Sequence, residues 1–321
     1  MTSTAPSFAL IQHELGAVEQ TLIETAQSDH PLMGPMLSMV LPGSGKRMRP
    51  ALALLTARLG DALPQAMTDM AVGVELLHAA SLVHDDVVDE SALRRGDETL
   101  FTRVGNALAV LVGDYLFAQS ASRCVATGNM RVIGLFAETL ASMCQGQIEE
   151  ASRLGKAHRV LTRDAYYQTI WGKTGSLFVL ACQGSAILAG LDEPQVQAMR
   201  HYGDRLGLAF QVVDDILDFI GDERVLGKQV GSDLKQGTVT LPVLCLRDKL
   251  PADEYASWFE REDVDLSELV ELVRTSGAID DAYDEARRLI AEAQASLSIV
   301  PPGAARDILH EIASYTVERP R

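Results

Sequence analysis

Two clusters of aspartates in the sequence share one form, two adjacent carboxylates with a third carboxylate three residues later. The clusters are Asp85-Asp86-x-x-Asp89 and Asp214-Asp215-x-x-Asp218. Carboxylates this close repel one another, and each costs several kcal/mol if it is buried without a partner. Each cluster must therefore lie on a solvated surface or be neutralised by a cation.

The segments that precede the clusters favour the cation. Residues 72–83 are largely apolar, with Glu75 their only formal charge, and residues 206–213 carry no formal charge before the second cluster. A single cluster would suit a solvated helix end equally well. Two clusters of the same form on apolar segments favour a metal site instead.

Helical spacing indicates which metal this would be. Asp85 and Asp89 are four residues apart, so they share a helix face that also carries His78 and Leu82. The second cluster repeats this geometry. Two such helices facing each other would present oxygen ligands alone, which suit Mg²⁺ better than zinc. Because Mg²⁺ in such sites keeps positions open for phosphate oxygens, we expect a substrate that carries phosphates.

Basic residues occur close to both clusters, mostly where predicted helices begin or end. They are Lys46, Arg47 and Arg49 in the loop before Pro50, Arg94 and Arg95 after the first cluster, and Lys173, Lys228 and Lys235 in glycine-rich breaks. Each of these would be an ordinary surface cation by itself. Their grouping beside the aspartates favours a diphosphate site, and a helix that begins at Pro50 would add backbone donors for an anion.

The elements that must position these residues are predicted to be helices. Apolar residues recur at three- and four-residue spacing through most of the chain, for example over residues 51–59, 107–117 and 177–188. The pattern predicts an all-α protein of about ten helices in a single domain spanning residues 1–321. Segments from residue 254 onward are strongly acidic with fewer apolar runs, so we expect them at the periphery.

Composition excludes several classes of protein. A formal charge of −16 argues against a nucleic-acid or anionic-membrane surface. The uncharged run over residues 174–191 is too short for a membrane span and is expected to be a buried helix. The four cysteines have no metal-binding spacing, and no secretory signal is visible, so we expect reduced thiols in the cytoplasm.

Five ordered segments resemble the trans-isoprenyl diphosphate synthases, also called polyprenyl synthetases. They cover residues 45–50, 78–96, 172–175, 210–218 and 227–233, and the resemblance extends from about residue 31 to 315. It implies an antiparallel helical bundle around a central cavity, of the isoprenoid synthase type, and a homodimer. It also implies three Mg²⁺ ions, with Mn²⁺ as an alternative, and the head-to-tail condensation of isopentenyl diphosphate with an allylic diphosphate.

The resemblance also assigns roles to residues at matching positions. Direct metal ligands would be Asp85, Asp89 and Asp214, supported by Asp86, Asp215 and Asp218. The allylic diphosphate would be held by Arg94, Lys173, Thr174, Gln211 and Lys228, with Lys235 as a weaker candidate. Isopentenyl diphosphate would be held by Lys46, Arg49, His78 and Arg95. Thr238 departs from the family pattern, since a lysine often stands there.

Helix geometry suggests how long the product becomes. One helical turn is about 5.4 Å, so the residues four and five positions before Asp85 form the first floor below the metal site. Ser81 and Ala80 at these positions are small, and Leu77 follows one turn deeper. We therefore expect a product of C20 or longer, a long-chain polyprenyl diphosphate, with geranylgeranyl diphosphate as the alternative.

Three other readings compete with this one. A class I terpene cyclase also uses the first aspartate motif, but its second motif usually differs and it needs no binding loop at residues 45–50. A non-catalytic subunit of a heteromeric synthase would generally lose the aspartates. A di-iron bundle is suggested by Glu75-x-x-His78, but the second motif of that kind is replaced by Asp307-x-x-His310.

Overall fold

The computed structural model describes residues 6–28, 30–41, 47–94, 96–153, 161–221, 230–260 and 266–318. Within these ranges the chain is helical almost throughout, as predicted. A short antiparallel pair, β1 (Leu93–Arg94) and β2 (Asp97–Glu98), is the strand structure in this part of the chain. The described helical segments outnumber the ten predicted, because turns divide several of the apolar runs.

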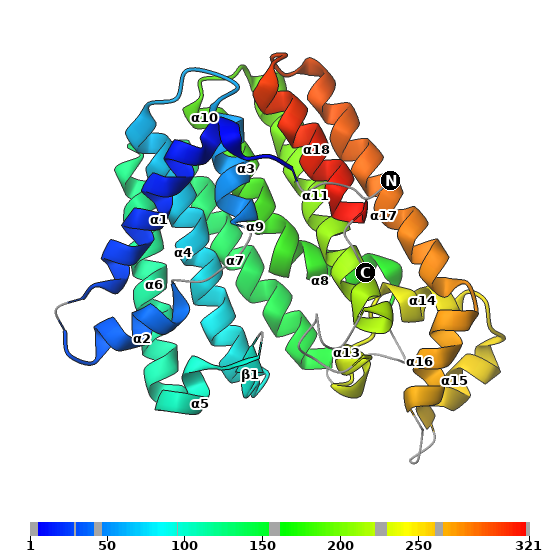
Figure 1. Ribbon diagram of the computed structural model, residues 1–321. Helices are drawn as coiled ribbons and strands as arrows, with labels where there is room; N and C mark the ends of the chain where they lie inside the picture. Colours follow the sequence, from blue (N-terminus) through cyan, green and yellow to red (C-terminus); the bar gives the residue numbers. More distant parts are fainter. Residues whose placement is uncertain are drawn as a thin grey trace.

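The first half of the chain forms one side of the bundle (Figure 1). It contains η1 (Ala9–Ile11), α1 (Gln12–Ala26), α2 (Met33–Val40), α3 (Met48–Ala57), α4 (Pro64–Val88), α5 (Leu100–Val104), α6 (Asn106–Ala126) and α7 (Met130–Arg153). Ser120 Oγ of α6 donates to Gly73 O of α4 at 2.7 Å, and His84 Nε2 lies 3.1 Å from Val110 O. These pairs run in opposite directions along the chain, so α4 and α6 are antiparallel.

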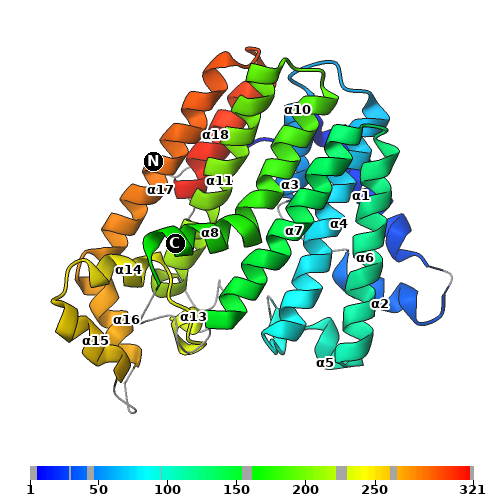
Figure 2. The same cartoon turned by 180° about the vertical axis from the view of Figure 1, so that it is seen from behind.

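The second half completes the bundle (Figure 2). It contains α8 (Arg163–Ile170), η3 (Trp171–Gly175), α9 (Ser176–Val179), η4 (Leu180–Gly184), α10 (Ser185–Leu188), α11 (Glu193–Ile220), α13 (Ser232–Lys235), α14 (Leu241–Arg247), α15 (Ala252–Glu260), α16 (Leu266–Thr275), α17 (Ala278–Ser296), η5 (Leu297–Ile299) and α18 (Ala304–Glu318). The segments from α8 to α10 follow one another without a break. η3 and η4 are single π-helical turns within this run, and such turns often occur at functional sites.

The aspartate clusters lie on two long helices, with 25 residues in α4 and 28 in α11. Pro64 begins α4, and a capping box begins α11, where the Asp192 side chain accepts from Gln195 N at 2.9 Å. Each cluster lies in the last turns of its helix. The carbonyl end of a helix dipole disfavours negative charge, so cations are needed at both clusters.

The prediction that the C-terminal segments are peripheral is wrong for α17. This helix packs against α11 (Figure 1). It buries Ala282, Ala286 and Leu289 among other side chains. Half of its eight buried residues are alanines, and acidic residues lie between them, so the sequence shows no long apolar run here. α17 is therefore part of the core.

Of the described helices, α4 is long and apolar enough to cross a membrane, with a mean hydropathy of 1.3. However, 72% of that apolar stretch is buried inside the protein. The helix also carries Asp69 and Glu75 at buried positions. α4 is accordingly a core helix of the bundle. The predicted buried run over residues 174–191 is also confirmed as core, from Thr174 to Ala186.

Candidate active site

A cavity of about 480 Å³ lies between the C-terminal parts of α4 and α11. α7, α8 and η3 add further wall, and residues 236–240 border another side. The predicted site residues that border it are Arg49, His78, Ser81, Asp85, Asp89, Arg94, Lys173, Thr174, Gln211, Asp214 and Asp215. The two clusters, far apart in the sequence, thus face one space together with basic side chains.

In the first cluster the outer aspartates border the cavity and the middle one does not. Asp86 is buried and accepts from Arg94 Nε at 2.9 and 3.1 Å. Burial raises the pKa of Asp85 to about 6, although nearby Lys173 lowers it, and burial also raises the pKa of Asp89. The nearby protein cations therefore leave part of the negative charge uncompensated, which fits a bound metal cation.

In the second cluster Asp214 borders the cavity beside the more deeply buried Asp215. Asp215 accepts from the Tyr166 hydroxyl at 2.6 Å and from Gln211 Nε2 at 2.9 Å. Gln211 in turn accepts from Thr174 Oγ1 at 2.7 Å. Burial raises the pKa of Asp215 well above its ordinary value. A continuous set of hydrogen bonds therefore joins the η3 turn to the second cluster.

The last aspartate of the second cluster faces a different element. Asp218 is buried, and it accepts from Ser232 Oγ at 2.7 Å and from Asp233 N at 3.2 Å. Both donors belong to α13. Asp218 therefore fixes α13 next to the cavity, where Asp233 adds another carboxylate to the wall.

Lys173 and Glu150 form an ion pair inside the cavity, made possible by a close crossing of α7 and η3. A Cβ at Gly146 would lie 2.7 Å from the amide nitrogen of Lys173, and one at Gly172 would lie 3.1 Å from Gly146 Cα. Glycine at both positions lets the helices approach. Although burial lowers the pKa of Lys173, its acidic neighbours, Glu150 first, raise it above its ordinary value.

Arg47, which caps the start of α3, and Arg49, in its first turn, point to different places. Arg49 borders the cavity, with its guanidinium 5.0 Å from the centre of the Phe178 ring. Its buried Nε has no hydrogen-bond partner among the described residues, and burial lowers its pKa. A buried cation with an unused donor favours an anionic ligand. Arg47 instead binds Glu19 at 2.9 Å and Glu75 at 2.6 Å.

The described part of the chain does not place every predicted residue at the cavity. Lys46, Arg95 and Lys228 lie outside the residues that the structure describes. Lys235 is exposed and does not border the cavity, which weakens its assignment to the diphosphate. Thr238 does border it, so a hydroxyl occupies the wall where the family often has an ammonium.

The proposed floor is smaller than the sequence suggests. Ser81 borders the cavity, but Leu77 and Ala80 are fully buried and do not border it. Each residue turns an α-helix by about 100°, so Ala80 is rotated about 140° from Asp85, whereas Ser81 is rotated only about 40°. Sequence spacing therefore identifies the correct helical turn. The direction of the side chains decides that Ser81 borders the cavity and that Leu77 and Ala80 do not.

Sequence reasoning missed six polar residues that border the cavity. They are Gln147, Glu150, Tyr166, Thr169, Gln236 and Thr240. Asp233 also borders it, and it stands at the end of a family segment, so that resemblance contained a signal for it. Glu150 and Tyr166 carry no such signal, because their roles depend on contacts with other helices.

The donor set fits a hard divalent cation. Carboxylates from both clusters face the same space, and oxygen ligands suit Mg²⁺. Within the described ranges, no three His, Cys, Asp or Glu side chains are close enough to hold a metal ion by themselves. The ion would therefore complete its coordination with water or with phosphate oxygens of a substrate. The fold and the site together define an all-α enzyme with paired aspartate-rich helices.

Comparison with known proteins identifies the family. The polyprenyl synthetase model matches residues 30–275. Heptaprenyl diphosphate synthase component 2 of Geobacillus stearothermophilus is 37% identical over 97% of this chain and 98% of its own length. The chain belongs to the polyprenyl synthetase family and is a prenyltransferase.

Solved structures agree with this assignment. A polyprenyl synthase from Caulobacter crescentus, complexed with calcium and isoprenyl diphosphate, has a TM-score of 0.91 and 33% identity, covering 98% of this chain and 99% of its own. A decaprenyl diphosphate synthase from Rhodobacter capsulatus has a TM-score of 0.89 and 36% identity, covering 97% of this chain and 98% of its own. The all-α bundle is thus the family fold.

Proposed function

We propose that the protein condenses isopentenyl diphosphate head to tail with an allylic diphosphate, with trans geometry, and releases diphosphate. The observation that carries this proposal is the shared cavity, where carboxylates of both clusters meet Arg49 and Lys173. In this reaction the allylic C–O bond breaks, the double bond of isopentenyl diphosphate attacks the carbocation, and a proton is lost. No protein nucleophile is required.

The aspartates divide into ligands and supports. Asp85, Asp89 and Asp214 border the cavity and would hold Mg²⁺, with three ions expected. Their neighbours Asp86, Asp215 and Asp218 are buried and hydrogen-bonded to protein groups. When bound, Mg²⁺ would stabilise the negative charge that develops on the departing diphosphate.

Basic and polar side chains would bind the two diphosphates. We assign the allylic diphosphate to Arg94, Lys173, Thr174, Gln211 and Lys228, and isopentenyl diphosphate to Lys46, Arg49, His78 and Arg95. Lys173 is paired with Glu150, so a diphosphate bound to Lys173 would compete with this carboxylate for the ammonium. The apolar side chains of Leu82, Leu177 and Phe210 border the same cavity and suit a hydrocarbon chain.

The product is assigned as a long-chain all-trans polyprenyl diphosphate of C20 or longer. Small Ser81 at the cavity supports a chain that grows past the first turn below Asp85. The names of the heptaprenyl and decaprenyl relatives support the same assignment. These names favour a long-chain product over the alternative, geranylgeranyl diphosphate.

A homodimer in the cytoplasm is the proposed state of the protein. Large apolar side chains remain exposed on α6 and α7, including Leu111, Met130 and Ile148. A second copy would remove this surface from water. The Geobacillus relative is named a component 2, which makes a different partner subunit the competing arrangement. Light scattering of the purified chain would give twice the 34.7 kDa chain mass for a homodimer and the single mass otherwise.

One experiment tests the proposed reaction. The purified chain is incubated with isopentenyl diphosphate, Mg²⁺ and C5, C10, C15 or C20 allylic primers, and the products are measured by mass spectrometry. We expect diphosphate release only when both substrates and Mg²⁺ are present, with products beyond C20. Products that stop at C20 would identify a geranylgeranyl diphosphate synthase. Release without isopentenyl diphosphate would indicate a cyclase, and inactivity of the chain alone would point to a missing subunit.

A further inference from the structure

Two adjacent tyrosines of α8 make hydrogen bonds to two different helices. Tyr166 donates to Asp215 of α11 at the cavity, at 2.6 Å. Tyr167 donates to Glu285 Oε1 of α17 at 2.8 Å. The two rings also meet edge to face, with their centres 5.3 Å apart. The hydrogen bond of Tyr167 therefore lies next to the one that supports the second aspartate cluster.

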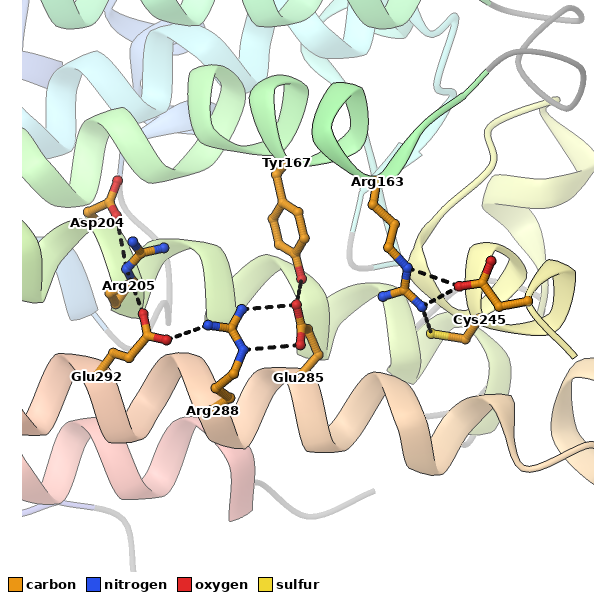
Figure 3. Close-up of polar contacts among 9 residues, drawn as sticks. Arg163, Tyr167, Asp204, Arg205, Cys245, Glu285, Arg288 and Glu292 are labelled. Carbon is orange, nitrogen blue, oxygen red and sulfur yellow. Dashed lines mark hydrogen bonds and ion pairs between the residues drawn. The ribbon is translucent and has the colours of Figure 1, made fainter.

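Glu285 is itself held in place by a network of charges. Arg288 binds both of its oxygens, with Nη2 at 3.0 Å from Oε1 and Nε at 3.2 Å from Oε2 (Figure 3). Arg288 also binds Glu292, which forms an ion pair with Arg205 of α11, with Oε2 3.0 Å from Nε. α17 thus presents a fixed acceptor to Tyr167 and is tied to the helix that carries the second cluster.

The protonation states suit this hydrogen bond. Hydrogen bonding from Arg288 lowers the pKa of Glu285, so the carboxylate is ionised at neutral pH. Burial, and next the bond to Glu285, raise the pKa of Tyr167, so the phenol keeps its proton. A neutral donor with an ionised acceptor forms one of the stronger kinds of hydrogen bond.

A second attachment lies one turn earlier on the same side of α8. Arg163 binds Asp248 Oδ2 through Nη2 at 2.8 Å and Nε at 3.1 Å, and its Nη2 lies 3.5 Å from Cys245 Sγ (Figure 3). Arg163 and Tyr167 are four residues apart, so they lie on the same side of α8. This side of α8 is therefore attached to Asp248 and to Glu285 at two successive turns.

Other side chains of the same helix border the cavity. Tyr166 and Thr169 border the cavity from α8, and Lys173 follows in the η3 turn without a break in the helix. A displacement of α8 would therefore move the donor of Asp215 and the ammonium of Lys173 together.

We propose that Tyr167 is a positioning residue for prenyl transfer: its hydrogen bond to Glu285 makes α17 the support that holds Tyr166 and Lys173 at the cavity. This inference rests on the proposed function, since it concerns the same cavity. Without the bond, Glu285 keeps Arg288 as a partner, but α8 loses one of the two attachments made by Arg163 and Tyr167. Tyr166 and Lys173 then sample a wider range of positions around Asp215.

Kinetics of Tyr167→Phe provide the first test, with Tyr202→Phe as the matched control. Tyr202 donates to Leu309 O at 2.7 Å, which joins α11 to α18 away from the cavity, so both changes remove one interhelical tyrosine hydrogen bond. We expect Tyr167→Phe to lower kcat about tenfold, the size of one hydrogen bond to a charged group, and to raise the Mg²⁺ concentration for half-maximal rate. Tyr202→Phe should lower Tm and leave both kinetic quantities unchanged. Equal kinetic losses in the two variants, or none in Tyr167→Phe, would overturn the proposal.

A double-mutant cycle tests whether Glu285 is the partner through which Tyr167 acts. Glu285→Gln keeps an oxygen acceptor and should retain more activity than Glu285→Ala, and Tyr167→Phe combined with Glu285→Ala should lose no more than the larger single loss. Additive losses would separate Tyr167 from Glu285 and contradict the inference.

Hydrogen exchange tests positioning independently of activity. We expect faster amide exchange over residues 163–175 in Tyr167→Phe and unchanged exchange there in Tyr202→Phe. If the wild type makes no prenyl product, the proposed function fails, and the exchange comparison still decides whether Tyr167 holds α8. Unchanged exchange in Tyr167→Phe would overturn its positioning role.

Discussion

Arg94 binds Asp86 through two nitrogens, with Nε 2.9 Å and Nη2 2.8 Å from the same carboxylate oxygen, Oδ1. The pair joins β1 to the last turn of α4. It occupies the middle aspartate of the first cluster, while Asp85 and Asp89 border the cavity. The three carboxylates of this motif therefore have different roles. Asp86 holds Arg94, whereas Asp85 and Asp89 face the cavity.

The Arg94 pair gives a prediction for stability. Asp86→Asn should lower the free energy of unfolding by about 1–2 kcal/mol, because a buried hydrogen-bonded acceptor loses its charge. Urea denaturation measures this change. Asp97→Asn, at an exposed position of β2, is the control and should stay within about 0.5 kcal/mol of the wild type. Equal losses of unfolding free energy in the two variants would contradict a stabilising role for the Arg94–Asp86 pair.

Asp85 should make the metal-free protein less stable as the pH rises. Its pKa is about 6 in the folded protein and 3.8 in the reference state, so the folded state binds more protons between these values. Stability is therefore lost as pH rises from about 4 to about 6, by roughly 3 kcal/mol at neutral pH. Asp85→Asn removes this loss, and Mg²⁺ should reduce it in the wild type.

Chemical denaturation at pH 5.0 and 7.5 in EDTA measures this effect. The stability advantage of Asp85→Asn over the wild type should grow by roughly 1.5 kcal/mol between the two pH values, about half of the full change. Added Mg²⁺ should reduce the stability advantage of Asp85→Asn over the wild type at pH 7.5. An advantage that is independent of pH would contradict the raised pKa of Asp85.

The crossing of α7 and η3 predicts opposite effects for two glycines of α7. Gly146→Ala places a Cβ 2.7 Å from Lys173 N and 3.0 Å from Thr169 O, so the helices must separate. We expect a loss of about 1–3 kcal/mol in stability and a lower kcat, because Lys173 moves with η3. Gly134 has nothing within 4 Å of an added Cβ, so Gly134→Ala should be neutral or stabilising by up to about 1 kcal/mol. Thermal unfolding and steady-state kinetics compare the two, and a tolerated Gly146→Ala would refute the close-crossing explanation.

Ser81→Phe should shorten the product. The side chain at this position borders the cavity within one turn of Asp85, so a ring there would block a growing hydrocarbon chain. Ser81→Ala keeps the space and should preserve the product distribution. Mass spectrometry of products from a common C15 primer distinguishes the two. An unchanged product length in Ser81→Phe would place the floor of the cavity elsewhere.

The sequence was sufficient for the helical class and for most groups at the cavity. A repeat of 3.6 residues per turn fixes which side chains share a face, so the spacing of Asp85 and Asp89 alone was enough to pair them. It did not predict that α17 belongs to the core, because half of the buried residues of α17 are alanines, which resemble a solvated helix when they alternate with acidic residues.

Residue types and their spacing along the chain were enough to predict the chemistry, namely two carboxylate clusters on apolar helices with cations at their ends. They could not predict which side chains meet across helices: Lys173 with Glu150, Tyr166 with Asp215, and Tyr167 with Glu285. The reason is physical. Spacing along a helix is set by the backbone repeat, whereas contacts between helices depend on how closely and at what angle they pack, and here that closeness depends on glycines such as Gly146 and Gly172.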